Sequence, residues 1–131
     1  LVWLSRHEAY ASGEPVREGD RGRQYFRHFC QMIEEDYAGQ HSVEHYAGRI
    51  GITAPYLNVL CRQYVDQSAL ELIHQRVVLA AKRNLVYTSM TISVVSYTLG
   101  FSDPAYFTRF FKRQVGLSPK EFRKRAATLL E

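Results

Sequence analysis

Basic side chains recur at helical spacing in the segment that follows Gly100. Arg109 carries a planar fork of N–H donors, which matches the O6 and N7 acceptors of guanine in the major groove of DNA. Lys112 and Arg113 stand three and four positions later, so one helix would place all three on a shared face. Cations beside a base-reading arginine suit phosphate contacts. The group predicts a DNA-reading helix, and the alternative for Arg109 is a salt bridge within the domain.

The other candidates in this segment share the same outer face, because Phe107, Phe110 and Phe111 are expected to enter the core. Tyr106 suits a sugar or a thymine methyl group, and equally the edge of the core. Ser102 suits a phosphate contact. The predicted DNA contacts of this segment are Ser102, Ala105, Tyr106, Thr108, Arg109, Lys112 and Arg113.

An earlier segment offers the same kind of face with weaker chemistry. The amide of Asn58 could bridge N6 and N7 of adenine. Val59 offers only an apolar surface, which suits a thymine methyl group. The predicted DNA contacts of this segment are Pro55, Tyr56, Asn58, Val59 and Arg62.

Both segments belong to a repeat centred on Gly51 and Gly100, which lie 49 positions apart. A small residue, Ala47 or Ser96, stands four positions before each glycine. Two helices that cross steeply through a short turn need the open backbone conformation that glycine supplies, and a small side chain where they approach most closely. The repeat therefore predicts two helix-turn-helix units, and its second copy argues against a plain helical bundle.

The rest of the pattern predicts an all-α fold, since helical periods with end signals recur and no strand-like alternation persists. Ser68 with Glu71, and Ser118 with Glu121, form capping-box patterns at two helix starts. The expected helices cover about residues 21–39, 42–50, 54–65, 68–87, 92–99, 103–114 and 118 onward.

Apolar faces are expected on the two longest of these helices, and both Cys30 and Cys61 are expected to be buried, reduced thiols. On the first helix, which Gly39 is expected to close, the face consists of Phe26, Phe29, Cys30, Ile33 and Tyr37. On the 68–87 helix it consists of Leu72, Ile73, Arg76, Val77, Leu79 and Ala80.

The chain divides into four expected parts. They are residues 1–20 as the tail of a preceding domain with a linker, 21–67 as the first helix-turn-helix subdomain, 68–87 as the connecting helix and 88–131 as the second subdomain. A helix is expected within residues 1–12, before linker chemistry of Gly, Pro and charge. Because the chain begins at Leu1 with no initiator Met and no signal pattern, we expect a piece of something longer.

The net charge of +4 conceals an asymmetry. Residues 1–81 carry 8 basic and 10 acidic side chains, while residues 82–131 carry 9 basic and 3 acidic ones. A basic C-terminal part indicates either a surface that binds phosphates or a solvated face. The same two alternatives apply to Lys120, Arg123, Lys124 and Arg125. No apolar run approaches the roughly 20 residues of a membrane span. We therefore expect a cytoplasmic protein without membrane contact.

The motifs GFSDPAYFTRFFKR at residues 100–113 and GLSPKEFR at residues 116–123 resemble the signature of the AraC/XylS transcription regulators. The resemblance covers about residues 21–127 and implies seven helices, with a long helix joining two helix-turn-helix subdomains. It also implies a separate domain, N-terminal and mostly absent here, that senses a ligand or dimerises, so an effector would act only through that domain. The family pattern often reads bases at Asn58 and Val59, but arginine is frequent where Val59 stands.

The sequence thus predicts a sequence-specific DNA-binding domain whose two recognition helices read adjacent major grooves, about one DNA turn or roughly 34 Å apart. Double-stranded DNA is the expected partner, RNA polymerase is considered as a further one, and neither a cofactor nor a metal is expected. Enzyme chemistry is disfavoured, since His41 and His45 have ligand-like spacing but no third ligand. The alternative is a helical protein-interaction module with an aromatic surface of Phe101, Tyr106, Phe107, Phe110 and Phe111.

Overall fold

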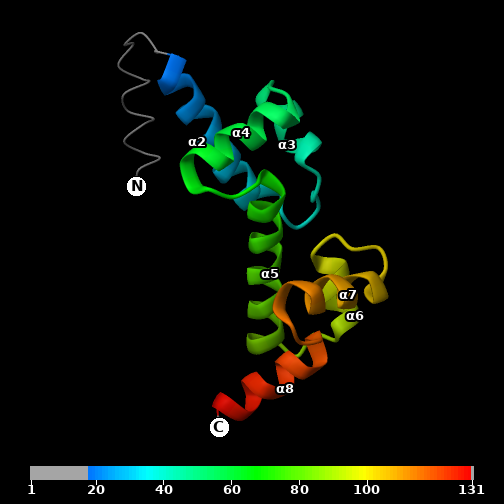
Figure 1. Cartoon of the computed structure of the whole chain (residues 1–131). Coiled ribbons are helices and arrows are strands. Elements are labelled where there is room, and N and C mark those ends of the chain that lie inside the picture. The colour runs from blue at the N-terminus through cyan, green and yellow to red at the C-terminus, as the bar shows by residue number, and fades with distance from the viewer. Residues whose placement is uncertain (1–17, 131) are drawn as a thin grey trace. The chain divides into compact units, whose positions relative to one another are not determined.

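The computed structural model describes residues 18–130, and these residues contain seven helices and no strand (Figure 1). In chain order the helices are α2 (Glu18–Asp36), α3 (Val43–Ile50), α4 (Ala54–Val65), α5 (Ala69–Tyr87), α6 (Ile92–Thr98), α7 (Pro104–Val115) and α8 (Pro119–Leu130). The all-α prediction is confirmed, while the helix expected within residues 1–12 lies outside the described residues. No helix in the described part is both long and apolar enough to cross a membrane.

By their contacts the described residues form two compact units. The first unit contains residues 18–35 and Ser42–Glu71. The second contains Asp36–His41 and residues 72–130. The chain therefore enters the second unit for six residues between α2 and α3, and returns to the first before it reaches α5.

In the first unit, α3 and α4 form a helix-turn-helix whose ends are capped as the sequence predicts. The hydroxyl of Ser42 accepts the His45 N–H, and that of Thr53 accepts the Tyr56 N–H. Gly51 between the two helices has a φ of +90°, a left-handed conformation that costs an L side chain about 1–2 kcal/mol. The buried core of this unit consists of Phe29, Met32, Ile33, Tyr46, Ala47, Leu57, Leu60, Cys61 and Ala69.

Three expectations for α2 are wrong in detail. The helix begins at Glu18 rather than near residue 21, so the last residues of the expected linker form its first turn. Its buried stripe contains Met32 in place of Cys30, because position 30 is turned away from the face of positions 29, 32 and 33; Cys30 is exposed. Gly39 does not close the helix with a left-handed conformation. Instead α2 ends at Asp36, whose carbonyl oxygen accepts the Gly39 N–H in the following turn.

The other cysteine, Cys61, is buried as expected, and burial raises the pKa of its thiol to about 12. A thiol with such a pKa is protonated at neutral pH and is therefore a poor nucleophile. Cys61 belongs to the core of the first unit, on the buried side of α4.

In the second unit, α6 and α7 form the other helix-turn-helix, and Figure 1 shows α7 and α8 beside α5. Gly100 in the turn has a φ of +87°, and Gly116 after α7 has a φ of +91°. Phe101, Phe107, Phe110 and Phe111 are buried, so the exposed aromatic surface of the interaction-module alternative does not exist; of that set only Tyr106 is exposed. Each fully buried phenylalanine side chain stabilises the fold by about 1.5–3 kcal/mol.

The apolar stripe of α5 also differs from the expected one. Leu79 is 41% exposed. Arg76 is half-buried, and its guanidinium lies 4.1 Å from the centre of the Tyr37 ring. The stripe is completed by alanines and by a later leucine, so that the buried residues of α5 are Ala69, Ile73, Val77, Ala80, Ala81 and Leu85.

Candidate nucleic-acid interface

The helix α7 is fixed at its start by Asp103 and Pro104. The Asp103 carboxylate accepts the Ala105 N–H at 3.0 Å, and Pro104 takes the first helical position, where a missing N–H costs nothing. Phe107, Phe110 and Phe111 then bury one side of the helix. The opposite side is therefore held outward by the core itself.

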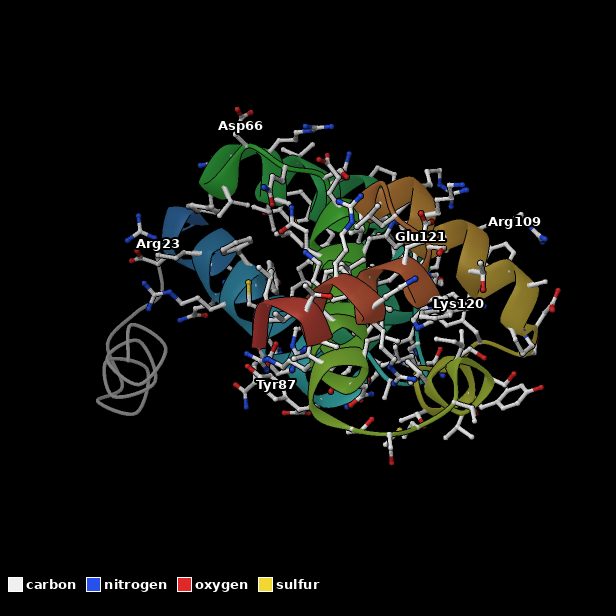
Figure 2. The ribbon with its side chains drawn as sticks, turned by 90° about the horizontal axis from the view of Figure 1, so that it is seen from below. Arg23, Asp66, Tyr87, Arg109, Lys120 and Glu121 are labelled. Carbon is white, nitrogen blue, oxygen red and sulfur yellow. The ribbon has the colours of Figure 1, made fainter. Side chains whose placement is uncertain are left out.

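On that outer side Arg109 is exposed, and Figure 2 shows it projecting away from α7. Its guanidinium lies 6.0 Å from the ring centre of Tyr106, which is 52% exposed. Lys112 and Arg113 are exposed in the last turn of α7, where the helix dipole favours positive charge. The structure therefore places these four side chains on one open face.

The remaining candidates of this unit lie at its margins. Ser102 and Ala105 are exposed, and Thr108 is half-buried at the edge of the core. All seven residues predicted from the second segment thus lie on α7 or in the turn before it.

In the first unit, α4 also presents an outer side, with Pro55 in its first turn. Tyr56 is 40% exposed and Val59 is 58% exposed. Arg62 is exposed as well, but its guanidinium lies 3.6 Å from the Glu71 carboxylate. This face is accordingly more apolar and less positive than that of α7.

Asn58 has a structural hydrogen bond within the first unit. It is half-buried, and its Oδ1 accepts the Ala69 N–H at 3.0 Å, at the start of α5. A bidentate adenine contact needs both the oxygen and the nitrogen of the amide. Asn58 thus joins α4 to the first turn of α5, because Ala69 has an N–H that lacks an intrahelical acceptor. Its contact with adenine stays a prediction, which would use the second lone pair of Oδ1 together with Nδ2.

In the final helix, α8, Arg123 differs from the other three cations for which phosphate binding and a solvated face were the alternatives. The guanidinium of Arg123 donates from Nε to the Leu85 carbonyl oxygen at 2.9 Å, with longer contacts of 3.5 Å to the carbonyls of Asn84 and Thr88. Arg123 thus satisfies carbonyl groups at the end of α5 and is not a surface phosphate ligand. The exposed cations of α8 are Lys120, Lys124 and Arg125.

Two capping boxes fix the starts of α5 and α8. Glu71 and Ser68 exchange hydrogen bonds of 3.0 Å each, and Glu121 and Ser118 exchange bonds of 3.1 Å each. These bonds, with nearby cations, hold the pKa values of the Glu71 and Glu121 carboxyls below their usual range. Both carboxylates are therefore charged at neutral pH beside the basic ends of α4 and α7.

A basic pair that the sequence reading missed flanks the recognition helix α4. Arg21 and Arg23 are exposed on the first turns of α2. Gly22 between them is buried, and a Cβ added to it would lie 3.0 Å from Cδ2 of Leu60 and 3.6 Å from the Tyr56 hydroxyl. The sequence Arg21-Gly22-Arg23 could have indicated this basic pair. The net negative charge of residues 1–81 gave no indication of a local positive site.

Comparisons with known proteins agree with this architecture. A family model described as a helix-turn-helix domain matches residues 46–125, more than half of the chain. The arabinose operon regulatory protein of Salmonella typhimurium is 35% identical over 98 residues, which cover 74% of this chain and 35% of that protein. The uncharacterized HTH-type transcriptional regulator YpdC of Escherichia coli is 30% identical over 113 residues, which cover 85% of this chain and 39% of that protein.

Solved structures show the same fold. The C-terminal domain of AraT, a response regulator from Geobacillus stearothermophilus, superimposes with a TM-score of 0.73 at 20% identity, covering 86% of this chain and 88% of that one. The DNA-binding domain of AdpA, solved in complex with a target DNA, has a TM-score of 0.69 at 24% identity, covering 76% and 90%.

These matches define a helix-turn-helix transcription-regulator domain with two helix-turn-helix units. The chain belongs to the AraC/XylS family of transcription regulators and is a sequence-specific DNA-binding domain of that family. It spans little more than a third of the length of the curated relatives it matches.

Proposed function

We propose that α4 and α7 each enter a major groove, and that the two grooves are adjacent on one DNA molecule. The observation that carries this proposal is the exposed face of α7, where Arg109 lies outside the core, about one turn before the exposed Lys112 and Arg113. A recognition helix reads bases from its outer side and anchors to phosphates from its flanks.

In the second unit Arg109 reads guanine through its two parallel donors. Tyr106, 6.0 Å from that guanidinium, packs on a sugar or a thymine methyl group. Lys112, Arg113 and Ser102 contact phosphates. Ala105 and Thr108 line the same groove as small contacts, so this unit supplies most of the specificity.

In the first unit Val59 contacts a thymine methyl group, with Pro55 and Tyr56 beside it on the exposed side of α4. Arg62 contacts a phosphate when it leaves the exposed pair with Glu71, which holds it weakly. Arg21 and Arg23 add phosphate contacts beside α4 and supply the positive charge that this helix lacks.

For the whole protein, we propose regulation of transcription in a bacterial cytoplasm, without catalysis and without a bound cofactor. The named relatives are regulators about three times as long as the matched region. A small-molecule effector acts through the rest of the protein, and RNA polymerase is a further partner once the domain is on DNA.

Selection of bound duplexes from a random DNA pool tests the proposal. We expect two conserved half-sites about one helical turn apart, roughly 10 base pairs, with guanine in one and thymine in the other. Affinity for the selected duplex should fall steeply with salt, because each neutralised phosphate releases counterions. A pool that yields no common sequence, or a single half-site, would overturn the two-groove proposal.

A further inference from the structure

We propose that the segment Asp36–His41, which runs from the last residue of α2 into the loop before α3, positions the recognition helix α7 of the second unit. The proposal rests on the proposed reading of DNA by α7, and it adds a part of the chain that lies about sixty residues before that helix. The segment contains none of the residues expected to touch DNA.

The first observation is a close backbone approach at Gly100. A Cβ added to this glycine would lie 2.6 Å from the Ala38 carbonyl oxygen and 3.1 Å from Cα of Gly39. Real Cβ atoms do not come so close to backbone, so the segment occupies the space that a side chain would need. Gly51, the matching glycine of the first unit, has no atom within 4 Å of an added Cβ. At Gly51 the left-handed φ of +90° is the only feature that requires glycine. At Gly100 the close approach of the segment's backbone requires it as well.

The second observation links the segment to α7 through aromatic rings. The imidazole of His41 lies 4.8 Å, centre to centre, from the ring of Phe101 in the turn. Phe101 in turn contacts the rings of Phe107 at 5.2 Å and Phe110 at 5.3 Å, both on the inner side of α7. Phe101 also lies 6.0 Å from the ring of Tyr106 on the outer side. A displaced Phe101 would therefore move the helix that carries Arg109.

The third observation concerns how the segment keeps its own shape. The Gly39 and Gln40 N–H groups both donate to the Asp36 carbonyl oxygen, at 3.0 and 2.9 Å. Nε2–H of His41 donates to the Tyr37 carbonyl oxygen at 3.1 Å. The Tyr37 ring is covered by the guanidinium of Arg76 on α5, 4.1 Å from its centre.

Together these contacts make a compact turn with two attachments, one on α5 and one on the turn before α7. Such a turn limits how far the α6–α7 turn can shift against α5. The reading face of α7 is therefore set partly by residues that precede α3, and the second unit is incomplete without them.

The test compares His41→Ala with His45→Ala, which removes a similar ring contact, 5.0 Å from Tyr46, in the first unit. The probe is the duplex selected by the unmodified chain, with guanine replaced in one half-site. We expect His41→Ala to reduce discrimination against the replaced guanine by tenfold or more, and His45→Ala to leave it unchanged. Gly100→Ala should act like His41→Ala where it folds.

A second comparison separates positioning from stability. Val95→Ala removes buried volume from α6 and leaves the segment's own residues unchanged, and it should keep the guanine discrimination at a temperature where both variants are folded. Equal loss in Val95→Ala, or full discrimination in His41→Ala, would overturn the proposal. If the unmodified chain shows no preference for guanine, the proposal that α7 reads guanine is wrong. Hydrogen exchange of the backbone amides in the free protein then tests whether the segment positions α7. His41→Ala should then speed exchange in α7 at least tenfold and leave α4 unchanged; unchanged exchange in α7 would overturn it.

Discussion

The two helix-turn-helix units use one scaffold, with positions matched at a spacing of 50 residues from the recognition helices onward. Thr53 and Asp103 cap α4 and α7. Asp66 and Gly116 end the same two helices in the left-handed conformation, with φ of 55° and 91°. The capping boxes of α5 and α8 follow at the same spacing. Backbone requirements are therefore met twice by interchangeable residue types.

The outward positions are not interchangeable in the same way. Val59 stands where the second unit has Arg109, and Arg62 stands where it has Lys112. Both pairs are exposed, so the core does not dictate the residue type. The comparison teaches that the fold fixes which positions of a unit are exposed, while the residue types at these positions can differ between the units.

One matched pair differs in its bond to the backbone. The Asn58 oxygen accepts the Ala69 N–H, whereas the positions that match these two residues in the second unit hold Thr108 and Pro119, and Pro119 has no N–H to satisfy. The second unit thus needs no acceptor at that place, and the first unit does. Asn58 therefore stabilises the junction of α4 with α5.

The largest expected difference concerns the two turn glycines. Gly51→Ala should lower the free energy of unfolding by about 1–2 kcal/mol, the cost of a left-handed alanine. Gly100→Ala should cost about 1–3 kcal/mol more, because its Cβ would overlap the Ala38 carbonyl oxygen. Urea unfolding of both variants measures the difference. Equal losses would show that the close approach at Gly100 has no energetic weight.

The next difference concerns DNA affinity. Arg109→Ala should weaken binding to the selected duplex by about 1–3 kcal/mol, and each 1.4 kcal/mol is a factor of ten. Val59→Ala should cost less than about 1 kcal/mol, because it removes only apolar contact. Val59→Arg should create a guanine preference in the first half-site. Titrations at one fixed salt concentration measure all three, and comparable losses for the two alanine variants would refute the unequal division of reading.

A smaller difference is expected at the helix junctions. Asn58→Ala should lower the free energy of unfolding by about 0.5–1.5 kcal/mol, because the Ala69 N–H loses its acceptor. Thr108→Ala, at the matched position before Pro119, should change it by less than about 0.5 kcal/mol. Thermal unfolding of the two variants checks this, and a larger loss for Thr108→Ala would contradict the assigned roles.

Falling pH should weaken the second unit, since His74 lies in it against the Phe110 ring. Burial, with the charges of His41 and Arg113, lowers the pKa of His74 from its usual 6.5. The unfolded chain then binds the proton more tightly, so the stability from neutral His74 is full above pH 6.5 and declines as pH falls below it. Urea unfolding at about pH 8 and about pH 5 measures the loss. His74→Gln should flatten this dependence, and an unchanged slope would assign it to other groups.

Much of the local structure could be predicted from the sequence, because caps and turns depend on neighbouring residues. Ser42, Thr53 and the Ser68–Glu71 box start helices as expected. The predictions were less accurate for the buried faces of long helices, because a small error in the helical period moves a residue off the face over several turns. The prediction that Cys30 is buried is wrong, because this residue is one position off the buried stripe of α2.

The candidate site was predictable to the same extent and for the same reason. The exposed face of α7 follows from the periodicity of its phenylalanines, which leaves Arg109 outside. The use of Asn58 and Arg123 was not predictable, since their partners are the Ala69 N–H and the Leu85 carbonyl oxygen, 11 and 38 positions away. Local patterns contain no information on which distant backbone group lacks a partner.

The sequence by itself determined two helix-turn-helix units, their capped helices and the outward side of α7, because these depend on spacings within a few turns of helix. Only the tertiary structure decided which polar side chains bind distant backbone groups, as Asn58 and Arg123 do. It also decided that Asp36–His41 belongs to the second unit, where its backbone lies against Gly100. The physical reason is that buried backbone groups must be satisfied and close-packed by whatever part of the chain reaches them.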